Sequence, residues 1–309
     1  MDPCPGCGGT TIAVRLPLYD EHGRTLPGEA LVCDGCGIAR TRYTVDIRSL
    51  EREYANTYYS YSMEGYDPSR LRLKRAFHSY IPLTIRRTIA RRWLTMLPPR
   101  RTGVVLDVGC GAGASLDIWK SLGWNTYGLE IDQGAIDACR TKGHAVYRAG
   151  SPEGQFSEAM FDWITMDNVL EHLDDPRATL RALRPLLKPD GVLTICVPNF
   201  GARDAALLAP YWAALDFPHH RFHFTTKGLR PLLEACGFAI TDLAYQPRFV
   251  AKSLLVHAGR RESGPEFEGL ARRVKRLHFR KLAALALAPK ISEEDGFFIT
   301  LDVRRTAAG

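Results

Sequence analysis

The sequence predicts an α/β protein built on a mostly parallel sheet, with a small cysteine-rich module at its N-terminus. From residue 103 onward, short apolar strands alternate with helices of about ten residues, and a glycine-rich loop ends the first strand. Four cysteines in two matched pairs predict the module. With 309 residues, 45% of them hydrophobic, the chain is long enough for one large domain and a smaller one.

Each pair of N-terminal cysteines has the form Cys-x-x-Cys-Gly, first at Cys4 and Cys7 and again at Cys33 and Cys36. A gap of two residues lets both sulfurs of a pair reach one tetrahedral ion, and two such pairs are typical of a four-thiolate zinc site. A redox Cys-x-x-Cys is the rival interpretation, which two matched copies disfavour. Because four thiolates leave no open position for substrate, we expect a structural Zn²⁺ in a zinc ribbon over residues 1–40.

The central elements follow from the alternation of apolar runs with helical patterns and turn residues. Strands are expected at 103–108, 126–129, 144–147, 162–166, 192–197, 238–245 and 296–303, and helices at 114–122, 133–142 and 176–187. Parallel strands of this kind are covered by helices on both faces and bind ligands at their carboxyl ends. Residues 41–101 are expected to form a helical lid or linker, and 102–309 the main domain, with a helical insertion at about 247–295.

The loop after the first strand holds Gly109, Gly111 and Gly113, which follow Asp107. Glycine lets the backbone turn sharply and approach a ligand closely. The spacing matches neither the G-x-G-x-x-G of a dinucleotide fold nor the G-K-[ST] of a nucleoside-triphosphate loop. Glu130 ends the second strand, where a carboxylate can accept hydrogen bonds from both hydroxyls of a ribose. The alternative for these residues is that the glycines serve only helix–strand packing and that Glu130 is exposed.

These motifs resemble the class I S-adenosylmethionine-dependent methyltransferases in order and spacing over roughly residues 100–246. The resemblance rests on LDVGCGAG at 106–113, FDWITMDNVLEHL at 161–173 and LKPDGVLTICVPN at 187–199. With the cysteine pairs and PHHRFHFT at 218–225, the chain is similar to a zinc-ribbon subgroup of bacterial enzymes that act on sugars, polysaccharide precursors and natural products. The resemblance implies a Rossmann-like sheet whose seventh strand is antiparallel.

The resemblance also implies S-adenosylmethionine as the cofactor, with the glycine loop along its methionine part and Glu130 on its ribose. Glu153 is the polar residue expected to meet the adenine, and Tyr59 belongs to a tyrosine-rich segment expected to form a lid over the cofactor. A plain surface loop is the alternative for that segment. The remaining cofactor contacts are expected at Asp107, Ile131, Met166 and Asp167.

Histidines are the candidates for proton transfer, because a general base with a pKa of about 6–7 assists methylation of a hydroxyl or an acidic C–H. The resemblance aligns His220 with a histidine of the family's pattern, and His172, just after the fourth strand, is the second candidate. His223 is the third. Metal binding by the histidines at 219–223 is disfavoured because no nearby carboxylate has a partnering register, and packing alone stays open as a role.

The net charge of +7 is distributed unevenly along the chain. Residues 40–101 include 14 basic and 5 acidic side chains, and residues 247–305 include 13 basic and 7 acidic ones. Such flanks can attract an anionic substrate, nucleic acid or a lipid surface, or can be solvated helix faces. One alternative is an RNA methyltransferase that uses the ribbon and these flanks, which is disfavoured because the ribbon is not basic and the fourth strand ends without N/D-P-P-[FY]. We therefore expect an enzyme that methylates a small-molecule or carrier-bound acceptor at oxygen or carbon. The basic flanks would suit an anionic acceptor. The other alternative is a non-catalytic binding protein.

The chain contains no run of about 18 apolar residues. Its first residues do not show the basic segment followed by an apolar segment that is typical of a signal peptide. The sequence thus predicts a cytoplasmic protein without a membrane span. Nothing in the sequence indicates its oligomeric state.

Overall fold

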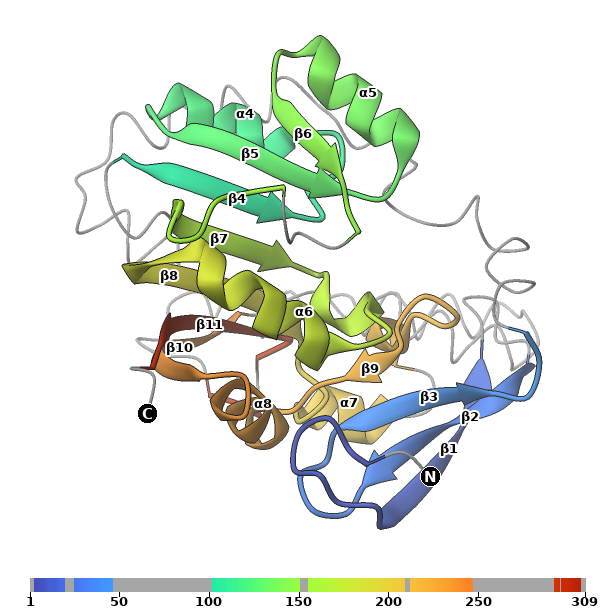
Figure 1. The fold of residues 1–309 in the computed structure, drawn as a ribbon. Coiled ribbons are helices and arrows are strands. Elements are labelled where there is room, and N and C mark those ends of the chain that lie inside the picture. The colour runs from blue at the N-terminus through green and yellow to red at the C-terminus, as the bar shows by residue number, and fades with distance from the viewer. Residues whose placement is uncertain are drawn as a thin grey trace.

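The computed structural model describes residues 3–19, 25–46, 102–150, 155–208, 212–246, 292–294 and 296–306. These residues form a seven-stranded sheet and a four-stranded sheet, which lie side by side in Figure 1. Most of the expected lid and most of the expected insertion lie outside the described residues, as do Tyr59 and Glu153. No helix in the described part of the chain is long and apolar enough to span a membrane.

The seven-stranded sheet has the order β10-β11-β8-β7-β4-β5-β6. Its strands are β4 (Val104–Val108), β5 (Asn125–Glu130), β6 (Ala145–Arg148), β7 (Phe161–Asp167), β8 (Leu187–Pro198), β10 (Phe238–Gln246) and β11 (Phe298–Arg305). The strands from β8 to β6 are parallel, whereas β11 is antiparallel to both of its neighbours. The expected mostly parallel sheet with an antiparallel seventh strand is confirmed.

The helices that start at Ala114, Gln133 and Pro176 begin where the sequence predicts them, and the described residues hold two further helices that it did not predict. The helices are α4 (Ala114–Ser121), α5 (Gln133–Thr141), α6 (Pro176–Leu183), α7 (Arg203–Leu208) and α8 (Thr226–Glu234), with 3-10 turns η4 (Leu170–His172), η5 (Arg184–Leu186) and η6 (Ala213–Leu215). Side chains cap three of the helices, since Asp132, Asp175 and Thr225 each accept a backbone N–H of the first turn. Helix α6 ends four residues before the predicted position, and the 3-10 turn η5, which contains Pro185, follows it directly.

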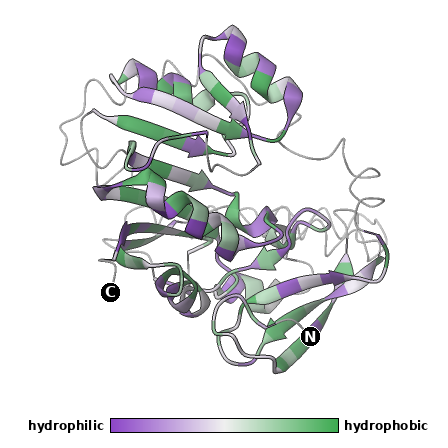
Figure 2. Ribbon diagram, in the orientation of Figure 1, coloured by the Kyte–Doolittle hydropathy of each residue, from purple (hydrophilic) through white to green (hydrophobic). Residues whose placement is uncertain are grey.

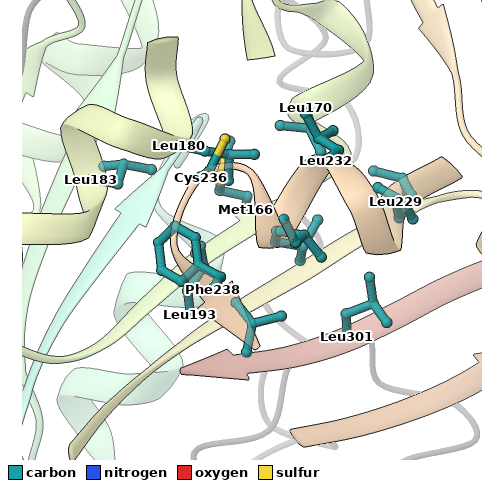
Figure 3. Close-up of a cluster of buried hydrophobic side chains, with 14 of the residues drawn as sticks. Met166, Leu170, Leu180, Leu183, Leu193, Leu229, Leu232, Cys236, Phe238 and Leu301 are labelled. Atoms are coloured by element: carbon teal, nitrogen blue, oxygen red, sulfur yellow. The ribbon is translucent and has the colours of Figure 1, made fainter. Parts of the chain in front are cut away.

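The core lies on both faces of the seven-stranded sheet. Val105 and Trp163 pack with apolar side chains of α4 and α5, and the next residues along the same strands, Leu106 and Ile164, pack with those of α6 and α8. The α6–α8 cluster is drawn in Figure 3. Figure 2 shows hydrophobic residues along β4 and β7 and alternating character around α5. A sheet covered on both faces presents functional groups only at its ends, which places the site at the carboxyl edge.

The N-terminal module is an antiparallel sheet of β1 (Ile12–Tyr19), β2 (Thr25–Cys33) and β3 (Ala39–Tyr43), so the expected boundary at residue 40 falls inside β3. A short strand from the large domain, β9 (Phe222–His223), pairs with β3 and completes the four-stranded sheet. This pairing joins the module to the histidine-rich segment through main-chain hydrogen bonds (Figure 1).

Candidate active site

The glycine loop connects β4 to α4 and is fixed to the end of β5. The N–H groups of Gly109 and Cys110 donate to the carbonyl oxygen of Leu129 over 2.8 and 3.2 Å. The φ angles of Gly109, Gly111 and Gly113 are 74°, 50° and 81°, which is backbone that residues with a Cβ rarely adopt. The loop therefore needs glycine at all three positions.

The three glycines differ in what surrounds them. A Cβ at Gly109 would lie 2.5 Å from Val169, and one at Gly113 would lie 2.8 Å from the sulfur of Cys139. A Cβ at Gly111 would meet nothing within 4 Å. Gly109 and Gly113 thus allow tight packing, while Gly111 borders open space in which a ligand can approach the backbone.

Glu130 ends β5 beside this space, and its side chain is buried. One carboxylate oxygen accepts the N–H of Gly111 over 2.8 Å, and the other accepts those of Ile131 and Asp132 over 2.6 and 3.0 Å. The carboxylate therefore ties the glycine loop to the strand end. Each of its oxygens has two lone pairs, so the group can also accept from a ligand.

Asp107 lies opposite Thr165 in the β4–β7 pairing and accepts its hydroxyl over 2.7 Å. Burial and, to a smaller degree, the nearby carboxylates of Asp167 and Glu130 raise the pKa of Asp107 to about 7, against the opposing effect of the hydrogen bond from Thr165. Three acidic side chains thus converge at the carboxyl ends of neighbouring strands. Such an edge favours a positively charged ligand.

The other predicted cofactor residues have different surroundings. Ile131 is 58% exposed directly after Glu130, whereas the Met166 side chain is fully buried among the apolar residues of Figure 3. That burial leaves only the backbone of Met166 for a ligand contact. Asp167 follows it at the strand end and accepts the side-chain amide of Asn168 over 2.8 Å.

A second polar cluster forms where η4 meets the segment that leads into β9. The rings of His172 and His220 pack edge to face with their centroids 4.6 Å apart. Nδ1 of His172 lies 3.1 Å from the carbonyl oxygen of His219, and Nδ1 of His220 lies 2.9 Å from that of Ala214. Since a carbonyl only accepts, both Nδ1 atoms carry hydrogen, and the lone pair of each neutral ring is on Nε2.

Glu171 completes this cluster. Its side chain is buried, and neither carboxylate oxygen has a hydrogen-bond partner among the described residues. One potential ligand atom from each of Glu171, His172 and His220 lies within 4.8 Å of the other two. Burial raises the pKa of Glu171 well above its usual range and lowers that of His172 to about 3. The sequence gives no signal that pairs Glu171 with the loop histidines, because it lies on a different element, although it directly precedes His172.

His223, the third candidate, faces the N-terminal module. It is buried on β9, and its Nε2 lies 3.1 Å from the hydroxyl oxygen of Thr41. Burial lowers the pKa of His223 well below its usual value. The structure thus brings His172 and His220 together and places His223 against β3.

The four N-terminal cysteines meet at one point. Their sulfurs all lie within 4.8 Å of one another, with 3.5 Å between Cys4 and Cys36 and between Cys7 and Cys33. Gly8 and Gly37 follow the two pairs with the same φ of 74°. Zinc–sulfur bonds of about 2.3 Å place tetrahedral sulfurs roughly 3.8 Å apart, so the four thiols fit one such ion.

A family match and two curated relatives agree on one family. The family described as "Methyltransferase domain" matches residues 77–243. The ubiquinone biosynthesis O-methyltransferase of Paracidovorax citrulli is 31% identical over 166 residues, which are 49% of this chain and 68% of that protein. The protein of the same name from Albidiferax ferrireducens is 31% identical over 187 residues, covering 55% and 70%. An S-adenosylmethionine-dependent methyltransferase structure from Mesorhizobium loti is 17% identical, with a TM-score of 0.47 and coverage of 68% and 94%.

Proposed function

Because this chain belongs to the S-adenosylmethionine-dependent methyltransferases, we propose that it methylates a hydroxyl oxygen of a small-molecule acceptor. The names of both relatives favour oxygen over carbon. The observation that carries the proposal is the cluster of Glu171, His172 and His220 at the carboxyl edge of the sheet, where a hydroxyl can be oriented and deprotonated.

The cofactor is proposed to lie along the glycine loop. Its ribose hydroxyls would donate to Glu130, and its methionine part would pass the open face of Gly111. The sulfonium and the ammonium group of S-adenosylmethionine are positively charged, which suits the acidic edge formed by Asp107, Glu130 and Asp167. Ile131, next to Glu130, offers an exposed apolar side chain for the adenosine.

S-adenosylmethionine supplies an electrophilic methyl group, and a C–O bond forms as its C–S bond breaks and the electron pair passes to sulfur. The protein has to hold the acceptor oxygen in line with that bond and exclude water. His220 and His172 are the proposed contacts of the acceptor hydroxyl, and Nε2 of the neutral His220 ring would accept its proton. His223 and Thr41 hold the segment that carries His220.

The four cysteines are proposed to bind one structural zinc ion. Their spacing fits a tetrahedral site, and four thiolates leave no position for substrate. The ion would hold the module that presents β3 to β9. Zinc would therefore support the histidine segment from a distance rather than take part in methyl transfer.

The proposal is tested by incubating the full chain with S-adenosylmethionine carrying a ¹³C-labelled methyl group and a panel of phenols, sugars and carrier-linked or carboxylated derivatives. Mass spectrometry is expected to find one added labelled methyl, and the ¹³C chemical shift is expected to identify an O-methyl ether. Transfer only to carbon, or only to RNA included in parallel, would contradict the proposal. Cofactor binding without transfer to any acceptor would instead favour a binding protein.

A further inference from the structure

The carboxylate of Glu171 is buried without compensation. Its side chain is 1% exposed, neither oxygen accepts a hydrogen bond from the described residues, and no ion pair to it occurs among them. Asp167 and Asp216, the charged groups that act on it, are also acidic and raise its pKa further, and its own backbone N–H is the group that opposes this rise. A buried carboxylate in such surroundings is costly unless it takes up a proton or a cation.

The two neighbouring histidines are oriented as metal ligands usually are. Each Nδ1–H donates to a backbone carbonyl, of His219 for His172 and of Ala214 for His220. A hydrogen bond of this kind fixes the ring and directs Nε2 toward a metal ion, and Nε2 of His220 also lies 3.8 Å from a carboxylate oxygen of Asp216. Those carbonyls belong to the same segment of chain, so one loop conformation orients both rings.

We propose that Glu171, His172 and His220 bind one divalent transition-metal ion of the zinc type, separate from the ion of the four cysteines. Two imidazole nitrogens and a carboxylate oxygen, each within 4.8 Å of the others, form a ligand set that suits zinc and leaves at least one position open. The cluster comes from two elements, η4 and the segment before β9, so the ion would also fasten that segment to the sheet edge.

The role of the open position rests on the proposed function. If the acceptor is a hydroxyl compound, its oxygen would take that position, and the cation would lower the pKa of the hydroxyl so that its proton passes to solvent. His172 and His220 would then act as ligands and not as bases. Metal binding itself does not depend on this role and is measured without acceptor or cofactor.

The test compares the metal content and spectra of three proteins produced in cobalt-supplemented medium without chelator: wild type, Glu171→Gln and Asp162→Asn. In both variants an amide replaces a carboxylate of the same size, so both are expected to fold. Asp162 is also buried, but it pairs with Lys188 and lies outside the cluster. We expect two cobalt ions per chain in wild type and Asp162→Asn, and one in Glu171→Gln.

The spectra identify which ion is lost. Cobalt bound by four thiolates has intense sulfur-to-metal charge-transfer absorption, which nitrogen and oxygen ligands do not produce. Glu171→Gln is expected to retain this absorption and to lose only the weaker visible bands of the second site. Identical metal content and spectra in wild type and Glu171→Gln would overturn the proposal and leave a protonated Glu171. A second ion without methyl transfer would refute the proposed function alone, and transfer without that ion would refute this inference alone.

Discussion

The hydroxyl of Thr41 donates a hydrogen bond of 2.9 Å to the backbone carbonyl of His220, and its oxygen lies 3.1 Å from Nε2 of His223. The single hydroxyl hydrogen is used on the carbonyl, so Nε2–H of His223 is the donor in the second contact. Thr41 is on β3, which also pairs with β9. The cysteine-bearing module therefore positions the segment that carries His220.

Thr41→Val should lower turnover while leaving S-adenosylmethionine affinity unchanged. Valine keeps the shape but removes a donor and an acceptor, each hydrogen bond contributing about 1 kcal/mol, so turnover should fall roughly tenfold. Steady-state kinetics and calorimetric titration of the cofactor measure the two effects. Thr41→Ser, which keeps the hydroxyl, should restore most of the rate, and a Val variant with wild-type turnover would remove this positioning role.

Cys33→Ser should lose the ion of the N-terminal module, because one ligand of a closed four-thiolate site is gone. Elemental analysis is expected to show one zinc fewer per chain than in wild type, together with a lower melting temperature. Cys236→Ser is a matched control, since Cys236 is also buried but lies outside the cluster. Wild-type protein purified without chelator that holds no zinc at this site would defeat the prediction.

His220→Ala should lower turnover by about 10²–10⁴, the range expected when a group acting on the reacting proton is removed. Cofactor affinity should change little, because His220 lies in the second polar cluster and not at the glycine loop. His172→Ala is expected to behave similarly. His223→Ala should mainly lower thermal stability, and equal losses of turnover in all three variants would mean that they act through packing.

Glu130→Gln should weaken S-adenosylmethionine binding. Glu130 accepts three backbone N–H groups and, in the proposed complex, the ribose hydroxyls. Bonds to a charged acceptor contribute about 1.5–3 kcal/mol each, so losing one should raise Kd by roughly ten- to two-hundredfold. Calorimetry with cofactor, set against circular dichroism of the free protein, separates lost binding from a disturbed loop, and an unchanged Kd would take Glu130 out of the site.

Asp107→Asn should change how stability depends on pH. Because the pKa of Asp107 is about 7 in the folded protein and 3.8 ordinarily, the native state binds this proton more tightly. Its stabilising effect is fully present below pH 3.8 and is lost as the pH rises through about 7. At about 1.4 kcal/mol per pKa unit, the difference reaches at most about 4 kcal/mol.

Asp107→Asn has no titrating group at this position, so its stability relative to wild type should increase as the pH rises from about 4 to about 7. Urea unfolding of both proteins at about pH 4.5, 6 and 8 measures the effect. Thr165→Val, which removes the hydrogen-bond donor to Asp107, should enlarge the wild-type pH dependence. Parallel curves for wild type and Asp107→Asn would show that Asp107 does not titrate in this range.

Features that depend on neighbouring residues could be predicted from the sequence alone. Strand and helix periodicity placed the elements of the sheet, and the predicted helix starts at Ala114, Gln133 and Pro176 are those of the structure. The Cys-x-x-Cys-Gly spacing predicted that four thiols would gather. These patterns are local because backbone preference, side-chain period and turn chemistry act over a few residues.

Only the tertiary structure decided which distant residues meet. It joined β9 to the sheet of the N-terminal module, set Glu171 beside His220, and turned Met166 into the core instead of toward the strand end. No spacing in the chain encodes these contacts, because they depend on how η4, β3 and the segment before β9 pack together. The sequence shows that Glu171 is acidic, but only the packing of its neighbours shows that its carboxylate is buried away from water without a hydrogen-bond partner among the described residues.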